Sequence, residues 1–421
     1  MENIKTKRSI ESVLASDCTG CYACMNCCHK DAISMIEDER GFSHPVINHD
    51  LCVNCGACYD ICPVNKEVSQ SMCFTPTSYS LTASPEISSR SSSGGAFSIL
   101  ANELLKRGGI VFGARSNGLE HVWHEETDNI EGLDILRRSK YFQSDIGFSY
   151  RKVKKYLVDE KEVLFVGTPC QIAGLKNYLR KDYQNLYTCD LICHGVPSKM
   201  VFRRFVKELE EKKHAKLLRY YRDSSQWAPV IFSSEYTRCL NAHQLYSRKP
   251  AAINEKSIES WKEVYPYDKD WFNLLFHSNL IQRRSCRHCR FCKVPRVGEI
   301  TLGDDWRYYS RHISDTDKLR LGRSFVIVNN KKGESLFKIA TKAVEDIQPA
   351  GYTEGPHINV APVENPLSEK FFEDIRKRKV TEAMWDYTTK KTLRVNCFLY
   401  MLHLKLNTKN KIKNITKKFF Q

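Results

Sequence analysis

The sequence predicts an α/β protein made of a small α+β domain followed by a larger α/β domain with a partly parallel sheet. Two observations carry this prediction. Cysteines gather in two closely spaced runs between residues 18 and 62, as they do in small domains organised around metal-bound thiolates. Further along, between residues 163 and 192, a short apolar strand is followed by a tight turn, a helix and a second strand. This order is the unit of a parallel sheet.

The two N-terminal cysteine runs share the spacing C-x₂-C-x₂-C-x₃-C. Three thiolates at this spacing wrap one 4Fe-4S cluster, and in two-cluster ferredoxins the fourth cysteine of each run binds the other cluster. Zinc would need only four thiolates and would leave the repeated spacing unexplained. Cys27 is left as a surplus thiol. We therefore expect one cluster on Cys18, Cys21, Cys24 and Cys62, and a second on Cys52, Cys55, Cys58 and Cys28.

The bulk composition sets limits on the class of protein. A chain of 421 residues is long enough for two or three domains, and its 18 Cys are clustered as metal ligands are, not spread as disulfides. Metal-bound thiolates need a reducing compartment, so we expect a cytoplasmic protein. The N-terminus leads into no signal peptide, and no apolar run reaches the roughly 18 residues that suggest a membrane span.

The positive charge is concentrated at the C-terminal end. The chain has a net charge of +16, and residues 376–421 hold 13 Lys or Arg against two acidic residues. The basic signal therefore belongs to a tail, and we expect no nucleic-acid partner. The tail is either a terminal helix packed on the body or a segment that lies on an anionic surface. That surface would be an acidic partner or the inner face of a membrane, where the protein would be peripheral.

The remaining chain divides into recognisable segments. Residues 69–93 are rich in Ser, Thr and Pro and are expected to form a loop. A helix is predicted through Phe97 and Leu105, before a strand at 110–112. The strand at 324–328, followed by a helical segment, repeats the parallel-sheet pattern seen earlier. The further elements predicted from periodicity are a strand at 163–166, a helix at 171–179 and a strand at 186–192.

Four further cysteines suggest a third metal site. Cys170 lies at a strand-to-helix turn and Cys193 at the end of the next strand, places that neighbour each other at the carboxyl edge of a parallel sheet. With Cys286 and Cys289 they make a plausible four-thiolate set. The alternative is that Cys170 and Cys193 are small buried apolar residues, as free cysteines often are.

Two loops are suited to an anion. Ser91–Gly95 and Gly167–Pro169 each precede a helix, and a helix N-terminus offers unpaired amides to a phosphate. Ser and Gly also cap helices for purely structural reasons. Beside iron–sulfur ligands, two such loops suggest a dinucleotide, and a flavin is chemically apt because it exchanges a hydride with substrates and single electrons with clusters. The sequence has no GxGxxG fingerprint for NAD.

Several short motifs together resemble one family, the beta subunits of coenzyme F420 hydrogenase and dehydrogenase. Its relatives include 7-hydroxymethyl chlorophyll a reductase and a ferredoxin-dependent vinyl reductase. The matching stretches are Ser92–Phe97, Ser139–Ser144, Gly167–Leu175, Asp190–Ser198, and Cys286–Cys289 leading to Gly298–Trp306. Glu299 departs from the family, which often has Asp there. Cys292 is an additional thiol, and the alternative ligand set has it in place of one of the four dispersed cysteines.

The resemblance implies FAD in the α/β domain and a third 4Fe-4S cluster on Cys170, Cys193, Cys286 and Cys289. It divides the chain into a dicluster ferredoxin domain (1–70), an FAD and iron–sulfur domain (71–345) and a basic extension (346–421). The flavin contacts that it implies are Ser92, Ser93, Gly94, Gly95, Lys140, Gln143, Gly167, Thr168 and Pro169.

These expectations favour an iron–sulfur flavoprotein oxidoreductase. It would relay electrons between 4Fe-4S clusters and FAD, with ferredoxin or another low-potential carrier as partner. FAD would reduce or oxidise an organic substrate or an F420-like coenzyme. No general acid is assigned, although His194 and Asp304 are candidates. The alternatives are a non-catalytic electron-transfer subunit of a larger dehydrogenase and a redox protein attached to a membrane-associated assembly.

Overall fold

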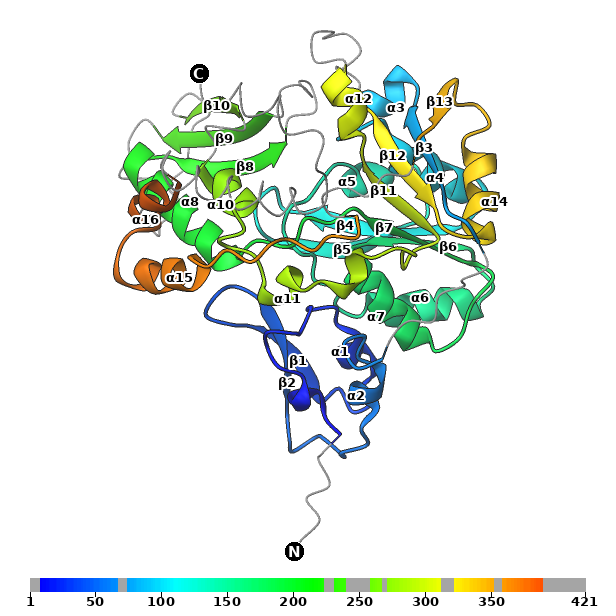
Figure 1. The fold of residues 1–421 in the computed structure, drawn as a ribbon, viewed down its shortest axis with the longest axis horizontal. Helices are drawn as coiled ribbons and strands as arrows, with labels where there is room; N and C mark the ends of the chain where they lie inside the picture. Colours follow the sequence, from blue (N-terminus) through cyan, green and yellow to red (C-terminus); the bar gives the residue numbers. More distant parts are fainter. Residues whose placement is uncertain are drawn as a thin grey trace, which may run out of the picture.

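A mixed eight-stranded sheet forms the centre of the larger domain (Figure 1). The computed structural model describes residues 8–66, 74–222, 231–239, 258–266, 271–311, 322–351 and 358–388. In spatial order the strands are β13 (Asp346–Pro349), β3 (Thr77–Thr82), β12 (Ser324–Val328), β11 (Ile300–Asp304), β7 (Leu186–Leu191), β6 (Val163–Gly167), β4 (Ile110–Ser116) and β5 (Val122–Thr127). The four central strands β11, β7, β6 and β4 run parallel, and the outer strands are antiparallel to their neighbours.

Helices cover both faces of this sheet, which explains why β6 is buried along its whole length. One core packs α4 (Ala96–Lys106) and α14 (Lys331–Ala340) against the sheet. The other packs α6 (Ser149–Val158) and α7 (Pro169–Leu179) on the opposite face. The second core also takes in Cys21, Tyr22 and Ile61 of the N-terminal domain. The two domains therefore share one continuous apolar core.

The N-terminal domain is small and lies beneath the sheet in Figure 1. An antiparallel pair, β1 (Ile33–Glu37) and β2 (Ser43–Ile47), packs with the short helices α1 (Ala23–Cys27) and α2 (Ala57–Ile61) and a 3₁₀ turn at Ile10–Ser12. Both α-helices begin after residues in the left-handed conformation, Tyr22 (φ +63°) and Gly56 (φ +74°). These turns let the chain reverse sharply around each cysteine run.

A three-stranded antiparallel sheet lies beside the large one. It contains β10 (Ile258–Pro266), β9 (Ile231–Cys239) and β8 (Lys216–Arg222). Its core is shared with α8 (Lys199–Lys213), α10 (Trp271–His277), α15 (Ser368–Lys377) and α16 (Val380–Thr388). Four shorter helices complete the described elements, namely α3 (Pro85–Ser89), α5 (Leu133–Leu136), α11 (Arg284–Arg287) and α12 (Trp306–Arg311), with a 3₁₀ turn at Arg290–Cys292.

The expected fold class is confirmed, and the predicted strand–turn–helix–strand unit is β6–α7–β7. Two predictions are wrong. The segment 69–93 is not a loop throughout, because it supplies β3 and α3. Several of its serines are buried but hydrogen-bonded, as when Ser80 Oγ donates to Asp305 Oδ2 (2.5 Å). The strand at 324–328 exists, but it runs antiparallel to both of its neighbours and does not extend the parallel unit.

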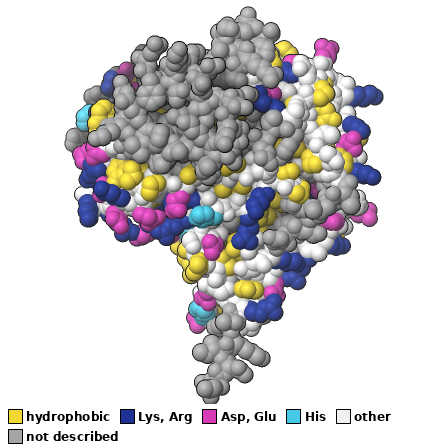
Figure 2. Space-filling model, in the orientation of Figure 1, with side chains coloured by type: hydrophobic (Ala, Val, Ile, Leu, Met, Phe, Trp, Pro, Cys, Tyr) yellow, Lys and Arg dark blue, Asp and Glu magenta, His cyan; other side chains and the backbone are white. Residues whose placement is uncertain are grey.

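Positive and negative side chains are interspersed on the described part of the face in Figure 2. This agrees with a body that is only mildly basic. Most of the basic tail lies outside the described residues, which end at residue 388. Within the described ranges, no helix has the length and apolar character needed to cross a bilayer.

Candidate functional site

The first predicted cysteine group lies where the two domains meet. Burial raises the pKa of Cys21 and of Cys24 well above the usual range, and neighbouring thiols of the group, including Cys62, raise both further. Burial also raises the pKa of Cys62. Such mutual effects require the thiols to be close neighbours. The donor set therefore fits a cluster that deprotonates all of its thiols on binding.

Cys18 differs from the rest of this group. Burial acts to raise its pKa, but a hydrogen bond with His44 and the charge of Arg283 together bring the pKa below its ordinary value. Arg283 Nη1 and Ser285 Oγ both donate to the Cys18 carbonyl oxygen, at 2.9 and 3.0 Å. The α/β domain therefore holds the backbone of this cysteine run in place.

The second group is nearer the surface. Cys28, Cys52 and Cys58 pack against one apolar cluster of the N-terminal domain, and Cys55 is exposed. The surplus thiol Cys27 is also here. Burial raises its pKa to about 12, with contributions from Cys58, Cys28 and Cys55, and its thiol donates to the Cys24 carbonyl oxygen at 3.2 Å. A fifth thiol thus stands beside the four expected ligands.

The third group is assembled from four separate places. Cys170 lies in the first turn of α7, Cys193 follows β7, Cys286 is in α11, and Cys289 precedes the 3₁₀ turn. Burial raises the pKa of Cys170 to about 11 and that of Cys193 to about 12. Burial also raises the pKa of Cys286, followed by the effects of Cys193, Cys289 and Cys170. All four dispersed cysteines are therefore neighbours.

Cys292 contacts one member of this third group, Cys289. Its thiol donates to the Cys289 carbonyl oxygen at 3.0 Å. A hydrogen bond with Cys292 is also the main reason that the pKa of Cys289 lies below its ordinary value. Cys189, in contrast, is buried within β7 and packs in the core beside the sheet. Among the described residues, no three His, Cys, Asp or Glu side chains converge as the ligands of a single metal ion would.

Residues of α6 and α7 link the first group to the third. Tyr150 is fully buried, and its hydroxyl lies 2.8 Å from the carbonyl oxygens of both Cys21 and Gln171. Gly174 faces the same place, because a Cβ there would lie 3.1 Å from Cys21 Sγ. Cys170 also contributes to the raised pKa of Cys21. Two thiol groups from different domains thus lie side by side.

A cavity of about 860 Å³ opens at the carboxyl ends of the parallel strands. Its volume is in the upper part of the range for small-molecule and cofactor sites. Cys193 of the third thiol group is part of its wall. Six of the predicted flavin contacts also line it, namely Ser92, Ser93, Gly95, Lys140, Gly167 and Thr168.

The other three predicted contacts are not among the lining residues. A Cβ on Gly94 would lie 2.2 Å from the Leu81 carbonyl oxygen, so this glycine allows close packing on β3. Gln143 Nε2 donates to the Thr19 carbonyl oxygen at 2.8 Å and holds the N-terminal domain. Pro169 is the buried first residue of α7. Thr168 and Gln171 form a capping box, so some backbone amides at the start of α7 already have hydrogen-bond partners within the chain.

Both candidate proton donors line the cavity. Burial lowers the pKa of His194 to about 3, helped by His277 and Arg222, so its imidazole is neutral at ordinary pH. Asp304 forms an ion pair with Arg222 at 2.7 Å. His124 and His277 also line the cavity, and no sequence motif points to them. Trp306, the last residue of the matching stretch Gly298–Trp306, lines it too. Only the topology of the sheet brings these residues together.

Two interleaved cysteine groups in a small N-terminal domain define a two-cluster iron–sulfur protein. Residues 17–66 match the family model described as "4Fe-4S dicluster domain". Residues 160–350 match the model for the C-terminal part of the beta subunit of coenzyme F420 hydrogenase/dehydrogenase. The chain therefore carries a 4Fe-4S dicluster domain followed by a domain of the coenzyme F420 hydrogenase/dehydrogenase beta-subunit family. This confirms the expected family and makes the chain an iron–sulfur electron-transfer protein related to oxidoreductases.

A search of curated proteins found no match. Among solved structures, one similar chain comes from "Xenon derivatization of the F420-reducing [NiFe] hydrogenase complex from Methanosarcina barkeri". It is 14% identical, with a TM-score of 0.41, and the alignment covers 76% of the present chain and 96% of the other.

Proposed function

We propose that this protein is a flavin-dependent iron–sulfur oxidoreductase. In this proposal FAD occupies the 860 Å³ cavity, and a third 4Fe-4S cluster is held by the four dispersed cysteines. Electrons pass between the N-terminal clusters and the cavity through this third cluster. Ferredoxin or a similar low-potential carrier is the proposed partner at the N-terminal domain. The substrate is an organic molecule or a deazaflavin-type coenzyme.

The observation that supports this proposal most strongly is the continuity of the thiol groups. Cys170 of the third group lies close enough to Cys21 of the first group to raise its pKa, and the third group reaches the cavity wall at Cys193. A chain of closely spaced redox centres that ends at a large cavity is the arrangement needed to deliver electrons to a bound cofactor. A purely structural set of buried cysteines would not need to end at a cavity.

The residues around the cavity suit a flavin. Ser92, Ser93 and Gly95 lie at the start of α4, and a helix N-terminus would favour an anion such as a pyrophosphate there. When bound, FAD would supply the exchange between two-electron hydride chemistry and single-electron transfer. The neutral His194 would accept or donate a hydrogen bond without adding charge.

The test is anaerobic purification followed by analysis of iron, sulfide and flavin. Three cubane clusters and one flavin predict about twelve iron atoms and one FAD per chain. A value near eight iron atoms would remove the third cluster from the proposal. Stoichiometric iron without any flavin would instead favour the alternative, an electron-transfer subunit that relays charge to a catalytic partner.

A further inference from the structure

One buried arginine differs from the other buried arginines of the described residues. Arg283 is 2% exposed, and it forms no ion pair within the described ranges. A buried charge is costly unless a counter-charge accompanies it. Each of the other buried arginines has such a partner: Arg137 pairs with Asp134, Arg222 with Asp304, Arg287 with Glu364, Arg296 with Asp190, and Arg323 with Asp346. The burial of Arg283 therefore implies a counter-charge that the carboxylates of the described residues do not supply.

The guanidinium group of Arg283 is enclosed by the N-terminal domain. Nη1 donates to the Cys18 carbonyl oxygen at 2.9 Å, and Nη2 donates to the Ser43 carbonyl oxygen at 3.0 Å. Its Cζ lies 5.2 Å from the centre of the Phe42 ring, and a Cβ on Gly20 would lie 2.8 Å from Nη2. Nε is buried and has no hydrogen-bond partner among the described residues. These contacts fix the side chain in place, but they are all with neutral groups.

Two carboxylates of this region already have other partners. Asp38 Oδ2 lies 3.2 Å from His44 Nε2. Asp145 Oδ1 lies 3.2 Å from Lys199 Nζ. Neither carboxylate forms an ion pair with Arg283, so its charge is left for another group to balance.

Arg283 lies between the first and the third thiol groups. It directly precedes α11, and its carbonyl oxygen accepts a hydrogen bond from the amide of Cys286 at 3.0 Å. Burial raises the pKa of Cys170, and the charge of Arg283 opposes that rise. Burial also acts to raise the pKa of Cys18, but His44 and the charge of Arg283 outweigh it. The backbone of Arg283 thus holds the third group, and its side chain holds the first.

We propose that Arg283 supplies one positive charge that the first and third clusters share, and that this charge raises the reduction potentials of both. The inference rests on the proposed function, because the third cluster is part of it. Four thiolates and an oxidised 4Fe-4S core sum to a net charge of about −2. One electron from the low-potential carrier changes this to about −3, and no proton is taken up. A fixed positive charge attracts the reduced state more strongly, so electrons that enter at the exposed second group are drawn towards the junction of the two domains.

A redox titration of the anaerobically purified full chain, followed by low-temperature EPR, tests this inference. Three clusters give three one-electron steps. Arg283→Gln should move two of these steps to more negative potentials, while the step of the exposed second cluster stays in place. We expect the reduction equilibrium of each shifted step to become about tenfold less favourable, which is about 59 mV for one electron. Arg283→Lys keeps the charge and should restore potentials close to those of the wild type.

Two control variants separate the charge of Arg283 from its other effects. Arg284→Gln removes the charge of the next residue, which is exposed and pairs with Glu369. Ser285→Ala removes the other side-chain hydrogen bond to the Cys18 carbonyl oxygen without changing any charge. Both variants should leave all three steps where they are in the wild type. If Arg283→Gln loses iron, Arg283→Lys decides the test: wild-type potentials in it support the inference, and more negative potentials refute it.

The remaining outcomes separate this inference from the proposed function. Unchanged potentials in an Arg283→Gln protein with about twelve iron atoms and one FAD would refute the inference and leave the proposed function standing. An equal shift in Arg284→Gln would reduce the effect to overall charge, and an equal shift in Ser285→Ala would assign it to the position of the Cys18 loop. Either result would also refute the inference. A wild-type protein with about eight iron atoms would refute the third cluster of the proposed function, and with it the shared role of Arg283.

Discussion

The N-terminal thiol groups and the third group are built from the same side chain but are encoded differently. The first two come from residues 18–62, where regular spacing determines which thiols meet. The third comes from four places between residues 170 and 289, brought together by a parallel sheet and the chain that follows it. The comparison teaches that a local site needs little more than its own loops, whereas a dispersed site depends on the whole fold.

The largest expected effect comes from removing one thiol of the dispersed group. Cys170→Ala and Cys289→Ala should each lose about four of twelve iron atoms while the N-terminal pair is retained, since a cubane with three thiolates is labile. Iron analysis and low-temperature EPR measure this. Cys292→Ala is the matched control, because Cys292 donates a hydrogen bond to Cys289 and its loss should leave the iron content unchanged. Iron loss like that of Cys289→Ala would instead make Cys292 a ligand. Full iron in both Cys170→Ala and Cys289→Ala would show that the dispersed cysteines hold no cluster.

A smaller effect is expected at the contact between the two regions. Tyr150→Phe removes the hydroxyl that bridges the carbonyl oxygens of Cys21 and Gln171. Because this group is buried, we expect unfolding to become easier by about 1–3 kcal/mol. Urea denaturation followed by the visible absorbance of the clusters measures the change. Tyr156→Phe removes the same atom from a partly buried tyrosine on α6 and should cost less. Equal costs would mean that the bridge does not hold the domains together.

The smallest expected effect is a pH dependence of stability that comes from His124 in the cavity wall. Burial lowers the pKa of His124 to about 4, although its ring nitrogen donates to the Val166 carbonyl oxygen at 2.9 Å. The unfolded chain takes up this proton near pH 6.5, so stability is complete above that pH and falls as the pH drops towards 4. Between pH 8 and pH 5.5 we expect a loss of about 1 kcal/mol from this group.

Urea denaturation at the two pH values, with His124→Gln as the comparison, checks this prediction. The variant has no titrating ring, so it should lose about 1 kcal/mol less than the wild type over the same interval. A wild type and a variant with the same pH dependence would show that His124 takes up its proton as easily in the folded chain as in the unfolded one.

The sequence allowed the local elements to be predicted because their signals are local. The strand, Pro169 and the capping pair of Thr168 and Gln171 follow one another within a few residues, and the structure has them as β6 and α7. The polar serines of the segment 69–93 predict a loop, which is wrong for β3 and α3. The burial of a serine such as Ser80 depends on a distant partner, Asp305. Composition cannot reveal a hydrogen bond across more than 200 residues.

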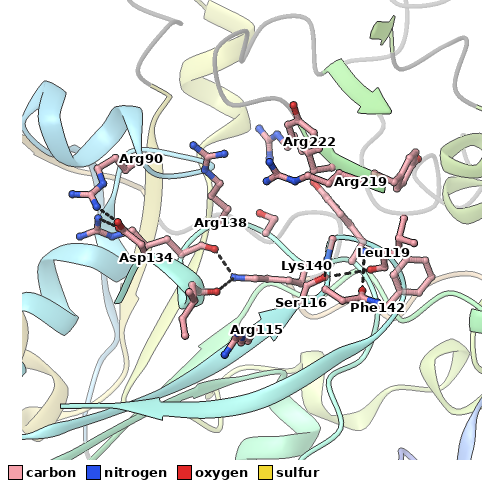
Figure 3. Close-up of a pocket in the computed structure, with 18 residues that line it drawn as sticks. Arg90, Arg115, Ser116, Leu119, Asp134, Arg138, Lys140, Phe142, Arg219 and Arg222 are labelled. Atoms are coloured by element: carbon pink, nitrogen blue, oxygen red, sulfur yellow. Dashed lines mark hydrogen bonds and ion pairs between the residues drawn. The ribbon is translucent and has the colours of Figure 1, made fainter. Parts of the chain in front are cut away.

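The direction of β12 and the cationic pocket between β4, α5 and β8 could not be predicted for a related reason. A strand and a helix read the same in sequence whether the strand runs parallel or antiparallel to its neighbours, and β11 and β3 decide this. The arginines that line this pocket (Figure 3) are at positions 90, 115, 137, 138, 219 and 222, with no common motif. These side chains line one pocket only because the fold brings the ends of β4 and β8 beside the loop after α5.

The docking of the N-terminal domain has a consequence for the order in which the protein matures. Gly20 packs against the Arg283 guanidinium group, with room for no side chain, and Arg283 also holds the Cys18 and Ser43 carbonyl oxygens. The loop that carries the first thiols is therefore also the surface by which the domain attaches. We expect iron to be inserted into this group while the domain is still detached. Attachment then encloses a finished cluster inside the protein. Oxygen and chelators should therefore reach the exposed second group first.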